Sequence, residues 1–199
     1  MRIVLVGATG TIGRAVAKEL GERHEIVAVG SRSGDVHMDI TEAASIRAGF
    51  ERIGRVDAVV SAAGKVKFAP LETMTEADYW LGLKDKLMGQ VNLVLIGRDF
   101  VNDGGSFTLT SGVLSHDPIR FGSSASMVNG AIDAFVRAAA IELPRGLRIN
   151  AVSPGVLLES MPSYGPYFRG HEPVPAARVA LAYAKSVEGL RTGQVFSVL

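Results

Sequence analysis

The sequence predicts an α/β fold in which helices cover both faces of a doubly wound parallel sheet. Short β-rich runs alternate along the whole chain with longer segments of helical periodicity. The first run, residues 3–6, is continuously apolar, as in a strand that is buried on both faces. The segments between the runs are long enough for the crossover helices that parallel strands require. Ligands of such sheets bind beyond the carboxyl ends of the strands, so candidate site residues are expected just after each strand.

Each expected strand is a β-rich run that is too short for a buried helix. In chain order, the strands are expected at residues 3–6, 25–29, 56–61, 106–110, 147–152 and 194–198. Gly7 ends the first strand, and Pro154 and Gly155 stop the fifth.

Each expected helix carries apolar residues at helical spacing between two strands. Helices are expected at residues 12–20, 74–100, 123–142 and 175–188, and a further one, with Thr41 as N-cap, carries Ile46, Phe50 and Ile53. The long helix 74–100 is expected to break or bend near Gly82 and Gly89. Neither an internal repeat nor a linker divides residues 1–199, so a single domain is expected.

The composition is that of ordinary globular protein and excludes several kinds of function. A net charge of +1 gives no electrostatic footprint for nucleic acid or an anionic membrane, so neither partner is expected. The absence of cysteine excludes thiol catalysis and cysteine-ligated zinc, and the four histidines are scattered, so no metal site is expected. The N-terminus lacks a signal-peptide layout, and no apolar stretch approaches the roughly 18 residues of a membrane span. A cytoplasmic protein is therefore expected.

Three glycines spaced three apart form a turn between the first strand and the first helix. Gly7 can make the tight turn, Gly10 can let the backbone approach a pyrophosphate, and Gly13 can let helix and strand pack closely. The start of the helix offers unpaired N–H groups and a positive dipole end to phosphates. The expected dinucleotide contacts here are Gly7, Thr9, Gly10, Thr11, Ile12 and Gly13.

The residues after the second strand indicate NADP(H) rather than NAD(H). NAD-preferring domains usually place an acidic residue near this point to hold the ribose hydroxyls, and the sequence has Ser31, Arg32 and Ser33 instead. Arg32 can pair with a 2′-phosphate between the two serines, with Arg14 as a possible helper. The alternative is a solvated loop arginine, and the nearby Asp35 weakens the NADP assignment.

These residues resemble the short-chain dehydrogenase/reductase superfamily over essentially the whole chain. The matching motifs are the glycine turn, Asp39-Ile40 at the adenine, Ser61-Ala62-Ala63-Gly64 in place of Asn-Asn-Ala-Gly, Thr110-Ser111-Gly112 at the catalytic serine, and Arg148–Gly155, whose Pro154-Gly155 flanks the nicotinamide. The resemblance implies a Rossmann-type sheet of about seven strands, with helices on both faces.

The chain departs from the family at the catalytic residues. The family uses a serine that bonds the substrate oxygen, a tyrosine acid/base, and a lysine four residues later that lowers the pKa of the tyrosine. Ser111 matches the serine. Aligning Ser124–Ser126 with the family's small-residue triplet puts Ser123 in the tyrosine's place and Met127 in the lysine's place. A serine hydroxyl is a weak acid and methionine carries no charge, so the resemblance implies an atypical member.

Other side chains are candidates for the missing proton donor. Lys86 takes the place of a family asparagine if Lys86-Leu87-Met88-Gly89 aligns with Asn-Leu-x-Gly, although Asn92 is another choice for that place. A lysine at this place would supply the missing positive charge from a neighbouring helix. The alternative is that Lys86 is an ordinary exposed helix residue without a role in the site. His116, and Tyr164 or Tyr167 in the expected substrate-covering loop, are further candidates with plain loop packing as the alternative.

Two classes of function remain open. Retention of Ser111 and of Pro154-Gly155 favours an NADP(H)-dependent oxidoreductase that acts on a small carbonyl or alcohol with an atypical proton donor. Loss of both tyrosine and lysine favours a catalytically inactive NADP(H)-binding sensor or regulatory protein. The resemblance also implies a homodimer or homotetramer through helix 123–142, whose Gly130, Ala131, Ala134 and Ala138 allow another helix to approach closely, either from a partner or from within the fold.

Overall fold

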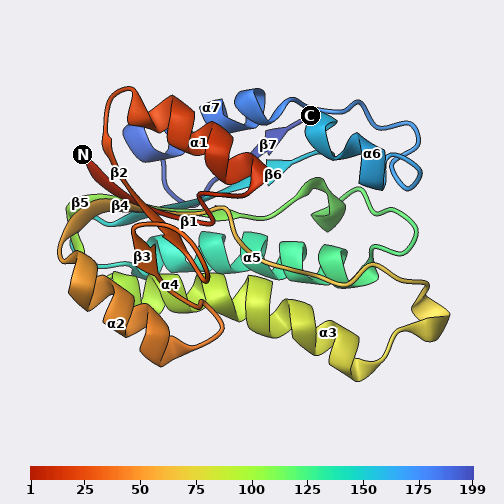
Figure 1. The fold of residues 1–199 in the computed structure, drawn as a ribbon, viewed down its shortest axis with the longest axis horizontal. Coiled ribbons are helices and arrows are strands. Elements are labelled where there is room, and N and C mark those ends of the chain that lie inside the picture. Colours follow the sequence, from red (N-terminus) through yellow and green to blue (C-terminus); the bar gives the residue numbers. More distant parts are fainter.

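The computed structural model describes residues 1–199 and confirms the expected α/β fold (Figure 1). One sheet of seven strands has the order β3-β2-β1-β4-β5-β6-β7, and every neighbouring pair is parallel. The strands are β1 (Arg2–Val6), β2 (Glu25–Gly30), β3 (Val36–His37), β4 (Val56–Ser61), β5 (Val101–Thr110), β6 (Arg148–Pro154) and β7 (Val195–Val198). The reversal of strand order beside β1 and β4 creates the crevice in which such sheets bind ligands.

Helices cover both faces of the sheet (Figure 1). One face carries α1 (Thr11–Gly21) and α7 (Ala176–Glu188), and the other carries α2 (Ala43–Ile53), α4 (Gly89–Gly97) and α5 (Ser123–Glu142). No helix is long and apolar enough to cross a bilayer.

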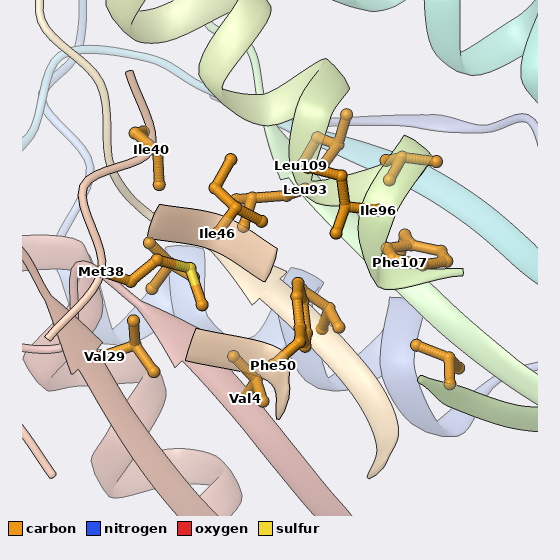
Figure 2. Packing of buried hydrophobic residues seen from close by; sticks show 14 of the residues in the cluster. Val4, Val29, Met38, Ile40, Ile46, Phe50, Leu93, Ile96, Phe107 and Leu109 are labelled. Atoms are coloured by element: carbon orange, nitrogen blue, oxygen red, sulfur yellow. The ribbon is translucent and has the colours of Figure 1, made fainter. Parts of the chain in front are cut away.

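Strand β1 contributes to a separate apolar core on each face of the sheet. Val4 and Val6 belong to the cluster beneath α2, α4 and α5, whereas Ile3 and Leu5 belong to the cluster beneath α1 and α7. Figure 2 shows the first cluster, in which side chains of α2 and α4 converge on Val4, Val29 and Phe107 from the strands. The double burial explains why residues 3–6 are apolar without alternation.

The long helical stretch is divided as the glycines predict. It consists of α3 (Glu76–Gly82), a π-helical turn (Leu83–Met88) and α4. A Cβ at Gly82 would lie 3.2 Å from Val128 on α5, and a Cβ at Gly89 would lie 2.8 Å from Ile40. Both glycines therefore allow close packing at the two ends of the π-helical turn.

The start of α2 and the strand β3 differ from expectation. Thr41 does not cap α2, because its hydroxyl donates to Asp39 and the helix begins at Ala43, after Glu42. Strand β3 has two residues, too few for a periodicity signal, and the sequence did not predict it. β5 begins at Val101, five residues before the expected start, in a polar and glycine-rich stretch.

Short elements follow β4, β5 and β6 at the carboxyl edge of the sheet. They are η1 (Leu71–Thr73), η3 (Val113–Ser115), η4 (Leu158–Ser160) and α6 (Met161–Tyr164). Glu159 of η4 accepts a hydrogen bond from the backbone N–H of Ala176, the first residue of α7. This contact attaches the segment after β6 to the body of the domain.

Candidate functional site

Two cavities lie at the carboxyl ends of the strands. We call them the Ser111 cavity, of about 270 Å³, and the Arg32 cavity, of about 210 Å³. The Ser111 cavity is lined by Ile12, Ala62, Val66, Phe68, Lys86, Ser111, Ala125, Asn129, Pro154, Gly155, Tyr164 and Phe168 among others. The Arg32 cavity is lined by Gly7, Thr9, Ser31, Arg32, Ser33, Asp39, Ile40 and Asp85 among others. Ala63 and Gly64 line both, so the two cavities are neighbours along the strand ends.

The three glycines of the turn are required for different reasons. Gly7 has φ +83°, and a Cβ there would lie 2.7 Å from the carbonyl oxygen of Ala62. A Cβ on Gly13 would lie 2.0 Å from the carbonyl oxygen of Gly7, which no relaxation of a side chain can relieve. Gly10 is exposed, and its Cβ would meet only the Gly7 oxygen, at 3.3 Å. The fold therefore requires Gly7 and Gly13, whereas the space above Gly10 is free for a ligand.

The first turn of α1 fits an anionic group. Gly10 is the N-cap residue, has no side chain, and leaves the N–H groups of the first turn without a side-chain acceptor. The first turn also contains no acidic residue, so it adds no negative charge beside the positive end of the helix dipole. These features fit the pyrophosphate of a dinucleotide lying over the turn.

Arg32 lies in its cavity with its charge uncompensated. It is exposed, forms no ion pair, and is flanked by Ser31 and by Ser33, whose Oγ lies 3.5 Å from Oγ1 of Thr9. Asp35 does not line the cavity, because its carboxylate accepts a hydrogen bond from the Ala28 N–H at 2.8 Å. The cavity is thus lined by two cationic residues, Arg32 and Lys65, and by three hydroxyl-bearing ones, a combination that suits a phosphate group.

The two carboxylates that line the Arg32 cavity are engaged by protein donors. Asp39 accepts from the hydroxyl of Thr41 at 2.8 Å and from its N–H at 2.9 Å, and these bonds lower the pKa of Asp39. Asp85 accepts from the N–H of Lys65 at 2.8 Å. Arg14 lies outside this cavity and donates to the carbonyl oxygen of Thr9, so it organises the turn and does not contribute to the phosphate pocket.

Gln90 fixes the end of β5 in front of Ser111. Its fully buried carboxamide accepts from the N–H of Thr110 at 2.8 Å and donates to the carbonyl oxygen of Thr110 at 3.0 Å. The Ser111 Oγ accepts from the N–H of Gly112 at 2.6 Å. Since a hydroxyl has one proton to donate, the proton of Ser111 remains available to a substrate oxygen.

The ammonium group of Lys86 lies beside Ser111. Nζ donates to the Ser111 carbonyl oxygen at 3.0 Å and to Oδ1 of Asn129 at 2.6 Å. Burial lowers the pKa of Lys86 to about 8, and the charge of Asp133 opposes this shift. The side chain is half-buried and lines the Ser111 cavity, and its stem packs on Gly64, where a Cβ would lie 2.6 Å from Cγ of Lys86. With two N–H groups engaged, the third remains for the cavity.

Helix α5 presents residues to the cavity that the sequence alignment did not choose. Ser123 and Met127 do not line the cavity; Met127 is 42% exposed, and Oγ of Ser123 lies 2.9 Å from the Tyr79 hydroxyl. Ala125 and Asn129 line it instead. Residues two positions apart on a helix point about 200° apart, so an alignment error of two residues exchanges the inner and outer faces. Residues 123–126 are all small, so the motif alone does not determine which of them corresponds to the family's tyrosine.

Asn129 is the functional candidate that sequence reasoning missed. It was detectable, because Asn129 and Asp133 are polar residues on the helical face that carries Val128 and Ile132. Ala125, four residues before Asn129, presents only a methyl group.

Other sequence candidates are less well placed. His116 is exposed and outside the Ser111 cavity, and its Nδ1 lies 3.2 Å from the Ser115 hydroxyl. Asn92 also lies outside this cavity. Among the tyrosines of the covering loop, Tyr164 lines the cavity and Tyr167 does not.

The segment after β6 covers the Ser111 cavity with apolar side chains. Tyr164 packs against Phe68 with ring centroids 5.6 Å apart, and Phe168 also lines the cavity. Tyr164 and Phe168 thus line the cavity, and the packing of Tyr164 on Phe68 also agrees with plain loop packing. Few polar side chains line the cavity, and those of Ser111 and Lys86 come from neighbouring positions.

A family model described as enoyl-(acyl carrier protein) reductase matches residues 3–183 of this chain. An uncharacterized oxidoreductase of Mycobacterium bovis is 28% identical over 216 residues, with 99% of this chain and 85% of that protein covered. An uncharacterized oxidoreductase of Methylorubrum extorquens is 27% identical over 179 residues, with 78% of this chain and 72% of that protein covered. Another relative, a short-chain dehydrogenase/reductase of Pestalotiopsis microspora, is longer, and the chain spans 62% of its length.

Solved structures give the same assignment of the fold. The crystal structure of the protein lin1944 from Listeria innocua superposes with a TM-score of 0.99 at 51% identity, and both chains are covered completely. A small-chain dehydrogenase in complex with NADPH superposes with a TM-score of 0.88 at 26% identity, covering 100% of this chain and 96% of the other.

Proposed function

Because this chain belongs to the short-chain dehydrogenase/reductase superfamily, in the family described as enoyl-(acyl carrier protein) reductase, we propose that it is an NADP(H)-dependent oxidoreductase of small carbonyl or alcohol compounds. The observation that carries this proposal is the pair of free donors in the Ser111 cavity, the Ser111 hydroxyl and the Lys86 ammonium. They lie at the end of β5, next to the cavity that suits a phosphate group.

The residues around both cavities fit a bound dinucleotide. Gly10 leaves the space for the pyrophosphate, and Pro154 and Gly155 line the Ser111 cavity, where the resemblance places the nicotinamide. The bound cofactor supplies or accepts the hydride. The NADPH complex of a 26% identical protein supports the choice of cofactor, as does the unpaired Arg32 beside Ser33.

Ser111 and Lys86 divide the work on the substrate oxygen. The Ser111 hydroxyl donates to the oxygen and orients the carbonyl carbon. The third N–H of Lys86 is the proton source for the oxygen as it becomes a hydroxyl, a role for which a pKa of about 8 is well matched to neutral pH. In the oxidation direction the neutral amine takes the proton back. A lysine from the π-helical turn thus replaces the proton donor that helix α5 lacks at Ala125.

The cavity favours a small substrate with apolar substituents. Its walls include Val66, Phe68, Leu114 and Phe168, and no carboxylate lines it. A volume of about 270 Å³ is at the low end for small-molecule sites, which disfavours bulky compounds.

The experiment that tests this proposal is single-turnover oxidation of NADPH with a panel of small ketones, aldehydes and enones. Lys86→Met should abolish hydride transfer while NADPH affinity stays within about twofold. Lys67→Met is the matched control, because Lys67 is exposed and outside the Ser111 cavity.

A second function is a catalytically inactive NADP(H)-binding sensor or regulatory protein. Ala125 favours it, since a methyl group stands where the cavity-facing side of α5 offers room for an acid. Tight NADPH binding without turnover of any compound in the panel would select this second function.

We also propose that the protein is a homo-oligomer through α5. Met127, Ala134 and Ala138 are exposed along one side of this helix, so these small and apolar side chains do not serve internal packing. Ile141, at the same helical spacing, is 87% exposed. An exposed apolar stripe of this kind suits contact with a second helix.

A further inference from the structure

Lys86 and Asn129 reach the same point from two different helices. Lys86 comes from the π-helical turn and Asn129 from α5, and their side chains meet with Nζ 2.6 Å from Oδ1. Lysine is only a donor, so the carboxamide oxygen must face it and the carboxamide nitrogen must point away. That nitrogen lies against Gly112, where a Cβ would be 2.8 Å from Nδ2. Asn129 is therefore held between Lys86 and the residue that follows Ser111.

The packing of α5 gives no reason for a carboxamide at this position. Asn129 is 3% exposed, on the face that carries the fully buried Val128 and Ile132. Burying an amide costs free energy unless its polar atoms are hydrogen-bonded, whereas an apolar side chain of similar size would pack there without that cost. The bond to Lys86 is the side-chain hydrogen bond that Asn129 makes.

We propose that Asn129 is a positioning residue, which holds the ammonium group of Lys86 at the Ser111 end of the cavity with one N–H directed to the substrate oxygen. This inference rests on the proposed function of Lys86. The lysine side chain has a flexible four-carbon stem, so Nζ could take many positions. Two fixed acceptors, Asn129 Oδ1 and the Ser111 carbonyl oxygen, hold it in one of them. Removing Oδ1 leaves one acceptor and frees Nζ to leave the reactive position.

The pair also has an exchange symmetry that can be tested. The Lys86 ammonium lies where the side chains of residues 86 and 129 meet. If the two residues were exchanged, an ammonium group and a carboxamide would still meet at this point, each from the other helix. The exchange conserves composition, charge and total side-chain volume, and such changes are well tolerated in cores. The double variant Lys86→Asn with Asn129→Lys should therefore restore a cavity ammonium that Lys86→Asn alone removes.

The charged surroundings of Lys86 are few. Asp133, one turn after Asn129 on α5, is the charged group whose interaction raises the pKa of Lys86 against the effect of burial. On its own segment, Lys84 pairs with Glu42, and Asp85 accepts from the N–H of Lys65. Gly64 and the Ser111–Gly112 backbone, which also pack around Lys86, carry no charge.

The first test follows the titration of Lys86 in the protein without cofactor, by NMR of labelled lysine side chains, with Lys86→Met to assign the signal. Asn129→Leu removes an acceptor that stabilises the ammonium, so it should lower the titration midpoint by at least about half a pH unit. Asn92→Leu, on α4 and outside the cavity, should leave it unchanged. If Asn129→Leu does not fold, Asn129→Ala serves in its place.

The second test uses turnover. Asn129→Leu should lower kcat at least tenfold, with KM and the Kd of NADPH changed less than about threefold, and the double exchange should exceed Lys86→Asn by at least tenfold. An unshifted Lys86 midpoint, or an exchange variant no better than Lys86→Asn, overturns the assignment of Asn129. If the unmodified protein turns over no substrate, the proposed function fails, and the titration alone then decides whether Asn129 holds the ammonium.

Discussion

The carboxylate of Glu159 accepts from the backbone N–H of Ala176, with N–O distances of 3.0 and 3.1 Å to its two oxygens. Ala176 is the first residue of α7, so its N–H has no partner within the helix. Glu159 itself belongs to η4, next to Ser160 in the wall of the Ser111 cavity. Glu159 thus caps the start of α7 although it lies 17 residues earlier in the chain. The same contact fixes the beginning of the segment that covers the cavity.

Removing this cap should loosen the covering segment. Glu159→Ala is expected to lower the free energy of unfolding by about 1 kcal/mol, the usual effect of losing a cap, which urea denaturation measures. Hydrogen exchange in residues 157–168 should accelerate in the same variant. Glu172→Ala removes an exposed carboxylate from the neighbouring loop and should change neither quantity. Equal exchange rates in the two variants would show that Glu159 does not restrain this segment.

The glycine turn should separate folding from binding. Gly10→Val is expected to give a folded protein whose Kd for NADPH rises at least about a hundredfold, since the added side chain occupies the free space above the turn. Gly13→Ala should unfold or strongly destabilise the domain, because its Cβ would lie 2.0 Å from a backbone oxygen. Circular dichroism and calorimetry distinguish the two outcomes, and unchanged NADPH affinity in Gly10→Val would place the dinucleotide elsewhere.

Arg32 should set the choice of cofactor. The unmodified protein is expected to bind NADPH more tightly than NADH by at least tenfold, or about 1.4 kcal/mol. Arg32→Ala should remove most of that difference by weakening NADPH alone, whereas Arg14→Ala should weaken both cofactors alike or neither, because Arg14 contacts the turn and lies outside the Arg32 cavity. Equal affinities for the two cofactors in the unmodified protein would contradict this assignment.

Carbonyl reduction should decline at alkaline pH. The protonated form of Lys86 donates, and its pKa is lowered to about 8, so kcat/KM for reduction should be level below that pH and fall as the pH rises through it. Oxidation of the alcohol needs the neutral amine and should show the opposite limb. Lys86→Met should remove both limbs together with most activity, and His116→Ala should retain the profile. A profile that survives in Lys86→Met would assign the proton to another group.

The exposed stripe on α5 should be an interface between copies of the chain. Ala134→Arg places a long charged side chain on this stripe and is expected to shift the sedimentation of the protein toward the monomer. Ala177→Arg, at an exposed position of α7, is the control and should leave the sedimentation unchanged. Monomeric behaviour of the unmodified protein at micromolar concentration would exclude the proposed oligomer.

The sequence predicted the features that depend on local periodicity and on short motifs. The bounds of α5 were predicted to the residue, and the π-helical turn falls between the two glycines expected to bend the long helix. Lys86 was a candidate from its place before Gly89. The cavity-facing residues of α5 could not be fixed, because Ser123, Ala125 and Met127 lie in a stretch without a distinctive side chain, and only packing against the sheet determines which face turns inward.

The facing of α5 decides where an added acid would lie. The double variant Ser123→Tyr with Met127→Lys adds both side chains outside the Ser111 cavity and should yield no new activity. A tyrosine at Ala125 would enter the cavity directly.

The π-helical turn fixes the length of the chain between α3 and α4. A π turn holds more residues than an α turn between the same two ends, so this stretch carries what amounts to one inserted residue. Deleting one residue of Leu83–Met88 would therefore restore an ordinary α turn between the same two ends, with Gly82 still at Val128 and Gly89 still at Ile40. The side chains between the two glycines, Lys86 among them, would be redistributed around the helix. The length of this stretch thus decides which side chain of the turn faces Ser111, so related sequences can be sorted by their indels here before any residue in the cavity is compared.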